Sequence, residues 1–499
     1  MGKFRMQLFL LGLLLFSVLF IGESFAGPQR PVVFVPGILG SRLVDINNNV
    51  VWGNTNSLLN YSHLELYPGS PGSSLKVAGL VNSINVLGPF WTIHEYDSLL
   101  DQIHRLGYVD NKNLFTFPYD WRKSNFDTAK MFDAFVTSNP ALREGKFDIV
   151  AHSMGGLVTK IWLINYGGAA RVNKVIYMGT PFQGSMNAFA TLSDGWGAFA
   201  NFMAGGLATV RRVTFSFPSI YELFPTYDAC CRLGDTGHHT MLDIFSPATW
   251  TQRDWLPAEY APGGARAAAF EHGLAQARQI GLLMRQPVPG VEEIKFAGDV
   301  IDTKLWLYVP QQNQSWKNWK FSQSRGDGTV PVWSAANNFT GTQGSEPSFV
   351  EHATIFADKW LSNKLDRELV PDTPPPVRAV EYDKVDTPSG PKKMTLATVE
   401  VDPPVAAPGE KVHLRISLQF DGPVARGDVK PDARLISAHR DLPLAETTTD
   451  ADMAVRRVTF DGEIEAPRQE DTHQIDVSLP GAGIRASYLT VFEASRRQP

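Results

Sequence analysis

Cysteine is scarce in this sequence, and the pattern of its use excludes a disulfide-built scaffold. The 499 residues contain two cysteines, and these are neighbours, Cys230 and Cys231. A conventional disulfide joins Cα atoms roughly 4.4–6.8 Å apart, whereas adjacent residues lie about 3.8 Å apart. We therefore expect two thiols or an occasional vicinal bridge, and a fold that a hydrophobic core must stabilise.

Strong charge and long apolar runs are also missing from most of the chain. The formal net charge is −5, with 43% hydrophobic and 19% charged residues. This balance gives no electrostatic reason to expect nucleic acid or an anionic membrane as a partner. Beyond the first 21 residues no apolar stretch approaches the length of a membrane span, so we expect a soluble mature protein. The oligomeric state is left open.

The one long apolar run lies at the N-terminus and has the order of a secretory signal. Lys3 and Arg5 precede the run 8–21, and small residues follow at 24 and 26. This order predicts a signal peptide over residues 1–26, with Gly27 as the mature start and a periplasmic or extracellular location. The alternative is an uncleaved membrane anchor, for which about 14 apolar residues are few.

The length predicts two or three domains, and the first follows an alternating pattern. Five short apolar runs are typical of buried strands, namely 32–35, 114–117, 147–150, 174–178 and 293–297. Helix-like segments, such as 98–106 and 128–136, lie between them. Strands that alternate with helices predict an α/β fold with a mostly parallel sheet, over residues 27–370.

An insertion interrupts this alternation between about residues 184 and 290. The stretch is rich in glycine, alanine, phenylalanine and tryptophan. A long insertion between sheet strands is often a cap or lid over a site. The alternative is a packed subdomain that does not move.

The chain changes character after a proline-rich stretch at residues 371–376, which is typical of a stiff linker. Residues 411–420 alternate strictly between apolar and polar side chains, and residues 475–479 repeat the alternation. Alternation of this kind predicts a β-sandwich over residues 377–499.

The clearest sequence evidence for catalysis lies at residues 151–156, Ala-His-Ser-Met-Gly-Gly. A strand-like run precedes this motif and a helix-like run follows it. That is the setting of the nucleophile elbow, in which small neighbours let strand and helix pass closely around a strained serine. Ala151 stands where the first glycine is usual, a change of one methyl group. We therefore predict that Ser153 is a nucleophile.

A serine nucleophile needs a histidine base and a carboxylate to orient it, and in this fold they follow the serine in the order acid, then histidine. Asp327, in a glycine-flanked loop, and His352, before a terminal helix, fit that order. The rival acids are Asp299 and Asp302. The rival bases are His272, His238 and His239.

Two backbone amides are candidates for the oxyanion hole. The amide of Met154 follows the nucleophile, and the amide of Ile38 lies in the turn after the first strand, where Gly37 lets the backbone bend. Asp235, His238 and His239 could suggest a metal site, but no further ligands follow at a suitable spacing in the sequence. We therefore expect no metal and no cofactor.

At these positions the sequence resembles the lecithin:cholesterol acyltransferase family of α/β-hydrolases. The resemblance is carried by the opening strand and turn at 31–43, Pro-Tyr-Asp-Trp-Arg at 118–122, the elbow, the strand end at 178–185, a segment at 217–225 and the acidic loop at 326–330. It implies an α/β-hydrolase fold over about residues 31–365. It also implies a triad of Ser153, Asp327 and His352, with Ile38 and Met154 as oxyanion donors.

Two departures from the family pattern are visible. The animal members of the family carry a disulfide-closed loop near their membrane-binding region, and this chain has no cysteine there. The β-rich tail after Pro376 lies outside the resemblance.

The resemblance implies a secreted serine acyltransferase or lipase that acts on phospholipid or neutral-lipid esters through an acyl-Ser153 intermediate, with transient contact to a lipid interface. The apolar insertion favours a lipidic acyl chain, because a fatty acid needs a long apolar groove. Two alternatives remain open at this stage. One is a non-lipid carboxylesterase that its C-terminal domain targets to a substrate, and the other is a non-catalytic binding protein on a hydrolase scaffold.

Overall fold

The computed structural model describes residues 30–491 with internal gaps at 55, 82–83, 88–90, 94–95, 197, 228–229, 236–237, 299–300, 313, 337–344, 349–350, 371–383, 403–404, 407, 436–437, 448–453, 469–470 and 480–481. The predicted signal peptide and the proline-rich linker lie outside the described residues. Within the described part of the chain, no helix has the length and apolar character needed to cross a membrane.

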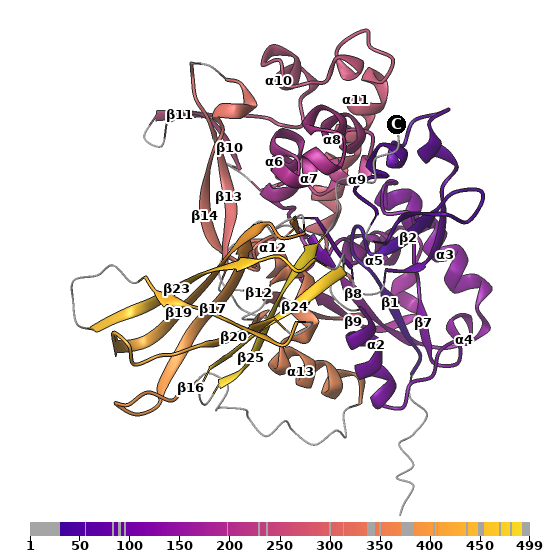
Figure 1. Cartoon of the computed structure of the whole chain (residues 1–499). Coiled ribbons are helices and arrows are strands. Elements are labelled where there is room, and N and C mark those ends of the chain that lie inside the picture. The colour runs from indigo at the N-terminus through magenta and orange to yellow at the C-terminus, as the bar shows by residue number, and fades with distance from the viewer. Residues whose placement is uncertain are drawn as a thin grey trace, which may run out of the picture.

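A parallel sheet forms the centre of the N-terminal half (Figure 1). Its six strands lie in the order β15-β12-β9-β8-β1-β7 and every neighbouring pair is parallel. Their bounds are β1 Val32–Val35, β7 Leu114–Thr116, β8 Phe147–His152, β9 Val172–Met178, β12 Glu292–Gly298 and β15 Ser345–Ser348. The five strands predicted from apolar runs are all present, and the predicted α/β class is confirmed.

The sixth strand, β15, was not predicted. Its sequence Ser-Glu-Pro-Ser has no apolar alternation, and Pro347 lacks the N–H that a central strand needs. Among the described strands, β15 lies at the edge of the sheet and pairs with β12. A proline is tolerated on such an edge strand, because its missing N–H costs no ladder hydrogen bond on the open side.

Helices cover the sheet in two packed pairs. α3 packs on α5, which itself contacts β1 and β8, while α2 and α13 are joined through Gln102, whose Nε2 donates to Ser362 O and Asp366 Oδ1. The bounds of the helices are α2 Tyr96–Arg105, α3 Asn125–Ser138, α4 Pro140–Arg143, α5 Met154–Asn165, α12 Val332–Ala336 and α13 Lys359–Leu369. Short 3-10 helices include η1 Tyr61–Leu64, η2 Pro71–Ser74 and η7 His352–Ala357.

The insertion after β9 forms a helical layer and part of a second sheet. Its helices are α6 Met186–Asp194, α7 Ala198–Met203, α8 Leu207–Thr214, α9 Pro218–Glu222, α10 Pro247–Gln252 and α11 Ala267–Met284. The sheet has the order β11-β10-β13-β14 and projects from the body of the molecule (Figure 1). Its strands are β10 Cys231–Asp235, β11 His238–Met241, β13 Ile301–Val309 and β14 Lys320–Gly326.

Many of the aromatic side chains described in this insertion pack against one another, whereas Phe202 is 57% exposed. Trp250 lies within 6.1 Å of four phenylalanine rings and 5.8 Å of Trp255, measured between centroids. Trp196, Phe215 and Phe217 are at most 2% exposed. These aromatic residues therefore build an interior core, and the aromatic composition of the insertion does not by itself indicate a lipid-binding groove.

The C-terminal region is a sandwich of two five-stranded sheets, in the orders β16-β17-β19-β23-β22 and β18-β25-β24-β20-β21. In β19 the alternating apolar residues 412–420 are buried at 1% exposure or less, as predicted. The strands are β16 Lys384–Val385, β17 Lys392–Asp402, β18 Val405–Ala406, β19 Lys411–Ala425, β20 Asp432–Leu435, β21 Arg440–Leu442, β22 Ala445–Glu446, β23 Ala454–Glu465, β24 Asp471–Leu479 and β25 Ala482–Val491.

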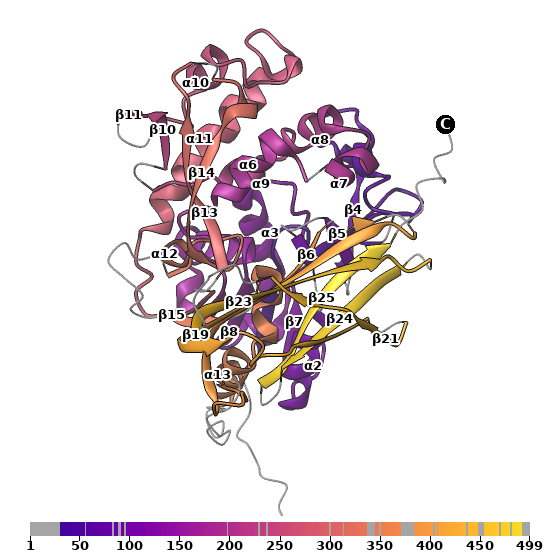
Figure 2. The same ribbon diagram turned by 60° about the vertical axis from the view of Figure 1, so that its left-hand side comes forward.

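The two regions have separate buried cores, one within residues 32–369 and one within residues 385–479. They also touch each other, since β25 contacts β5 (Ile84–Leu87) (Figure 2). A second contact joins β18 to α7. The domain boundaries predicted from the sequence stay predictions.

The adjacent cysteines are joined as a vicinal disulfide between Cys230 and Cys231. The expectation of two thiols is therefore replaced by its stated alternative, the vicinal bridge. Because the bridge spans one peptide bond, it closes no long loop and adds little constraint on the unfolded chain.

Candidate active site

Ser153 occupies a strained turn between β8 and α5. Its backbone angles are φ 52° and ψ −126°, which a residue with a side chain rarely adopts. The two glycines that follow have no room for a side chain. A Cβ on Gly155 would lie 2.5 Å from Pro36 O, and one on Gly156 would lie 2.0 Å from Thr180 Oγ1. The small residues of the motif are thus required by the close passage of strand and helix.

The three predicted residues Ser153, Asp327 and His352 lie within hydrogen-bond distance in the order of a catalytic triad. His352 Nδ1 is 2.7 Å from Asp327 Oδ2, and His352 Nε2 is 2.8 Å from Ser153 Oγ. Because a carboxylate only accepts, Nδ1 donates to it, and in the neutral imidazole Nε2 then accepts from the serine hydroxyl. All three residues are at most 3% exposed.

Asp327 is held by its own loop. Its Oδ1 accepts from Thr329 N at 3.0 Å and from Val330 N at 2.7 Å, which leaves Oδ2 for His352. The loop follows β14 directly, so the β13–β14 hairpin lies between the central strand β12 and the acid. A Cβ on Gly298, at the end of β12, would lie 2.3 Å from Asp327 Cβ. The end of β12 therefore still fixes the position of the acid.

Each rival candidate is either exposed or has a side chain outside the described residues. Asp302 lies on β13 and His272 on α11, and both side chains are exposed. Asp299 and the side chains of Asp235, His238 and His239 lie outside the described residues. Among the residues that are described, no group of three or more histidine, cysteine or acidic side chains is arranged to hold a metal ion.

The turn that carries Ile38 lies directly beside the elbow. β1 and β8 are parallel neighbours with Val35 opposite Ala151, so the residues after both strands emerge at the same edge of the sheet. A Cβ on Gly37 would lie 2.9 Å from Ser153 Cβ. This proximity brings the turn that carries Ile38 next to Ser153, the residue that precedes Met154.

Residues 118–122 brace this turn from outside. Tyr119 Oη donates to Pro36 O at 2.9 Å, while Tyr119 N and Trp121 Nε1 donate to Ser41 Oγ and Ser41 O at 3.0 and 3.1 Å. The turn is therefore tied at both ends, at Pro36 and at Ser41. The Pro-Tyr-Asp-Trp-Arg motif thus acts on the site through the backbone of the turn.

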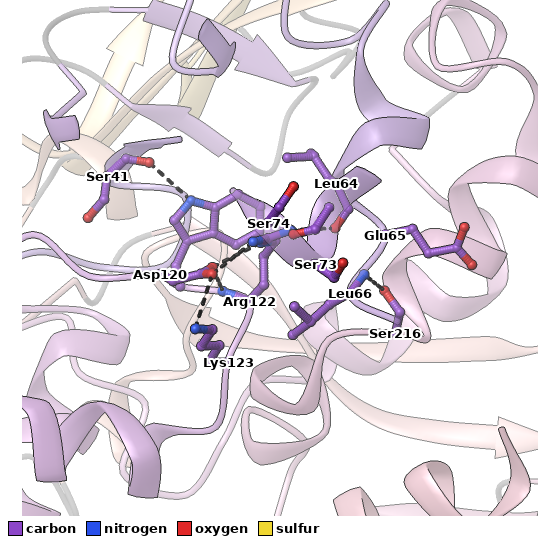
Figure 3. A network of polar contacts seen from close by, with 12 residues as sticks. Ser41, Leu64, Glu65, Leu66, Ser73, Ser74, Asp120, Arg122, Lys123 and Ser216 are labelled. Carbon is purple, nitrogen blue, oxygen red and sulfur yellow. Dashed lines mark hydrogen bonds and ion pairs between the residues drawn. The ribbon is translucent and has the colours of Figure 1, made fainter. Parts of the chain in front are cut away.

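Arg122 extends this brace to residues 61–74, here called the bridging segment (Figure 3). The guanidinium is fully buried and makes two bonds of 2.8–2.9 Å to the Asp120 carboxylate. Its Nη1 donates to Leu64 O and Gly72 O at 2.8 and 2.9 Å. A charge with this number of partners is well compensated, so Arg122 fixes the bridging segment to the core.

The bridging segment in turn holds the insertion. Glu65 forms ion pairs with Arg212 and Arg266. Leu66 N donates to Ser216 Oγ at 2.8 Å (Figure 3). The insertion is therefore attached to the core by partly buried polar contacts as well as by packing, an arrangement that favours the packed-subdomain alternative.

Two residues at the site were not identified from the sequence, namely Tyr96 and His152. Tyr96 Oη lies 2.9 Å from Gly37 N and 3.0 Å from His152 Nδ1, and His152 Nε2 lies 3.0 Å from His352 O. Burial lowers the pKa of His152 to about 3, and burial raises the pKa of Tyr96, so both groups are neutral. The position of His152 next to the nucleophile was the one sequence signal for this pair.

Comparison with known proteins agrees with the motifs. Residues 41–256 match the family model of lecithin:cholesterol acyltransferase. The predicted resemblance is confirmed for this segment, which contains Ser153 but neither Asp327 nor His352.

Two curated relatives match part of the chain. Lecithin-cholesterol acyltransferase-like 4 of Arabidopsis thaliana is 28% identical over 246 residues, which cover 42% of this chain and 44% of that protein. Phospholipase A(1) LCAT3 of Arabidopsis thaliana is 25% identical over 166 residues, covering 29% of this chain and 36% of that protein. The match thus spans less than half the length of either relative.

Solved structures resemble the fold more distantly. The alignment with a chain of the Tle4–Tli4 complex covers 66% of this chain and 95% of that chain, at a TM-score of 0.45 and 16% identity. The alignment with the mature form of Bacillus licheniformis lipase BlEst2 covers 70% of this chain and 96% of that chain, at a TM-score of 0.32 and 14% identity. The fold described above rests on the sheet topology and not on these weak likenesses.

Proposed function

We propose that this protein is a serine-dependent acyltransferase or lipase that acts on lipid esters through an acyl-Ser153 intermediate. The observation that carries the proposal is the hydrogen-bonded series Ser153, His352 and Asp327 on an elbow with positive φ. The match of residues 41–256 to the lecithin:cholesterol acyltransferase family supports lipid esters as the substrate class.

Acylation uses these groups in sequence. Ser153 Oγ attacks the ester carbonyl carbon while His352 Nε2 takes the hydroxyl proton, and the Asp327 carboxylate stabilises the resulting imidazolium. The carbonyl oxygen becomes an oxyanion that accepts from the backbone N–H groups of Ile38 and Met154. The carbon–oxygen bond to the leaving alcohol then breaks, and His352 returns the proton to that alcohol.

Deacylation repeats these steps with a different nucleophile. His352 takes a proton from water or from an acceptor alcohol, whose oxygen attacks the acyl-Ser153 carbonyl, and the proton returns to Ser153 Oγ. Water gives a free fatty acid and an alcohol gives a new ester. Hydrolysis and transfer therefore share every residue of the site and differ only in which acceptor reaches it.

Product analysis tests this proposal. The protein is incubated with phospholipid labelled in one acyl chain, in mixed micelles that contain a long-chain alcohol, and the free acid and the new ester are quantified. Label released or transferred by the wild type and not by Ser153→Ala supports the proposal. Equal turnover by Ser153→Ala, with both proteins folded, would overturn the assignment of the nucleophile.

A non-lipid carboxylesterase is the second candidate, because the aromatic side chains of the insertion are used in its packed core. A chain-length series of p-nitrophenyl esters, with and without micelles, separates the two. A preference for short soluble esters without activation by micelles would favour this candidate. A folded wild type without turnover on any ester would leave a binding protein on a hydrolase scaffold.

Secretion is part of the proposal and rests on the N-terminal pattern of residues 1–26. Expression of the full chain with N-terminal sequencing of the product tests it. A mature protein that begins at Gly27 agrees with the proposal, and an intact N-terminus in the cell fraction contradicts it.

A further inference from the structure

Three separate loops of the site are joined by one buried hydrogen-bonded chain. It begins at Gly37, in the turn after β1, and passes through Tyr96 Oη, at the start of α2, to the ring of His152 at the end of β8. It ends at the backbone carbonyl of His352 in η7. The three links measure 2.9, 3.0 and 3.0 Å.

The direction of every link follows from the donors and acceptors. The carbonyl of His352 only accepts, so His152 carries its proton on Nε2 and donates there. The ring is neutral, so Nδ1 is left as an acceptor and the Tyr96 hydroxyl donates to it. The Tyr96 oxygen then accepts the Gly37 N–H. Each of these polar groups has a partner, and the other neutral tautomer of His152 could not make both of its hydrogen bonds.

Packing holds the two side chains in place. Tyr96 and His152 are 3% and 6% exposed, and both rings lie 5.8 Å from the ring of Phe356. Gly37 fits against them because it lacks a side chain, since a Cβ there would lie 3.1 Å from His152 Nδ1. This series of hydrogen bonds therefore connects rigid elements, and a shift of one loop would be transmitted to the others.

We propose that Tyr96 and His152 are positioning residues, which hold the oxyanion turn and the loop of His352 in register around Ser153. This inference rests on the proposed function. Neither side chain is required to touch the substrate. Tyr96 Oη accepts the N–H of Gly37, so the next amide, that of Ile38, is the one that faces the reacting oxygen. His152 holds the backbone of His352, from which the ring of His352 projects.

The first test is Tyr96→Phe, with Tyr61→Phe as its matched control. Tyr61 is also a buried tyrosine, and its Oη lies 2.8 Å from Thr214 Oγ1, but it joins η1 to the insertion. Turnover of p-nitrophenyl butyrate and thermal unfolding are measured for both variants. We expect kcat of Tyr96→Phe to fall roughly 10- to 100-fold with KM within about twofold. Tyr61→Phe should lose a similar amount of stability and keep its kcat.

The second test compares His152→Ala with His152→Gln. The amide nitrogen of glutamine lies close to the place of imidazole Nε2 and donates to the His352 carbonyl, so this variant should recover roughly tenfold in kcat over alanine. This comparison decides the proposal if Tyr96→Phe does not fold.

The outcomes are distinguishable from a failure of the proposed function. A wild type that turns over no ester, or a Ser153→Ala variant that equals it, overturns the function itself. Normal wild-type turnover with equal kcat in Tyr96→Phe and Tyr61→Phe overturns the positioning role alone. So does equal kcat in the alanine and glutamine variants of His152.

Discussion

Replacing Arg122 by methionine should destabilise the N-terminal region strongly. The substitution leaves the Asp120 carboxylate, which is 4% exposed, without its bidentate partner. It also removes the donor to the carbonyls of Leu64 and Gly72. Removing one partner of a buried ion pair typically costs about 3–5 kcal/mol, because the remaining charge stays buried.

The exposed pair between Arg415 and Asp461 provides the control. The Arg415 side chain is 57% exposed, so Arg415→Met should cost less than about 1 kcal/mol. The double variant Asp120→Asn with Arg122→Met should be more stable than Arg122→Met alone, because no uncompensated charge is left.

The assay combines urea unfolding with hydrogen exchange of the bridging segment. Arg122→Met should lower the unfolding midpoint and speed exchange in residues 61–74 before the sandwich core is affected, because the two cores are separate. Equal midpoints for Arg122→Met and Arg415→Met, with unchanged exchange in the bridging segment, would refute this reasoning.

Two further predictions concern pH and the space around the site. Burial raises the pKa of Glu222 to about 7, so the folded protein keeps a proton that the unfolded chain loses above its ordinary 4.5. This group therefore stabilises the fold below about pH 4.5, and that contribution, about 3 kcal/mol, is lost as the pH rises to 7. Glu222→Gln should flatten the stability curve between these values, and an unaltered slope in urea titrations would contradict the assignment. Gly179→Ala should lower kcat at least tenfold, because its φ is +61° and the new Cβ would lie 3.0 Å from His352 Nδ1. Gly290→Ala, with φ +83° and open space around it, should lose stability but keep kcat.

The parts of the molecule that could be predicted are those whose pattern lies within a short stretch of the sequence. The elbow, the five apolar strands and the alternation in β19 each occupy a few consecutive residues, and their geometry follows from steric limits within that stretch. Asp327 and His352 were found by their order along the chain, and the structure brings both to Ser153. Their catalytic roles are the content of the proposal.

The parts that were not predicted depend on contacts between distant residues. Tyr96 precedes His152 by 56 residues, and His152 precedes His352 by 200, so no local pattern joins them. The role of aromatic residues in the insertion was also ambiguous, because a packed core and a lipid groove need the same composition. The hairpin strand β13 did carry a signal, since Thr303, Leu305, Leu307 and Val309 are its alternating buried residues.

The central claim is that Ser153 becomes covalently acylated, and trapping with a phosphonate ester tests it most directly. The protein is treated with an alkyl p-nitrophenyl phosphonate, and the adduct is located by intact mass and peptide mapping. The account predicts one adduct, on the peptide that contains Ser153, that is abolished in Ser153→Ala and formed much more slowly in His352→Gln. A folded protein that forms no adduct, or forms it equally in Ser153→Ala, would contradict the account.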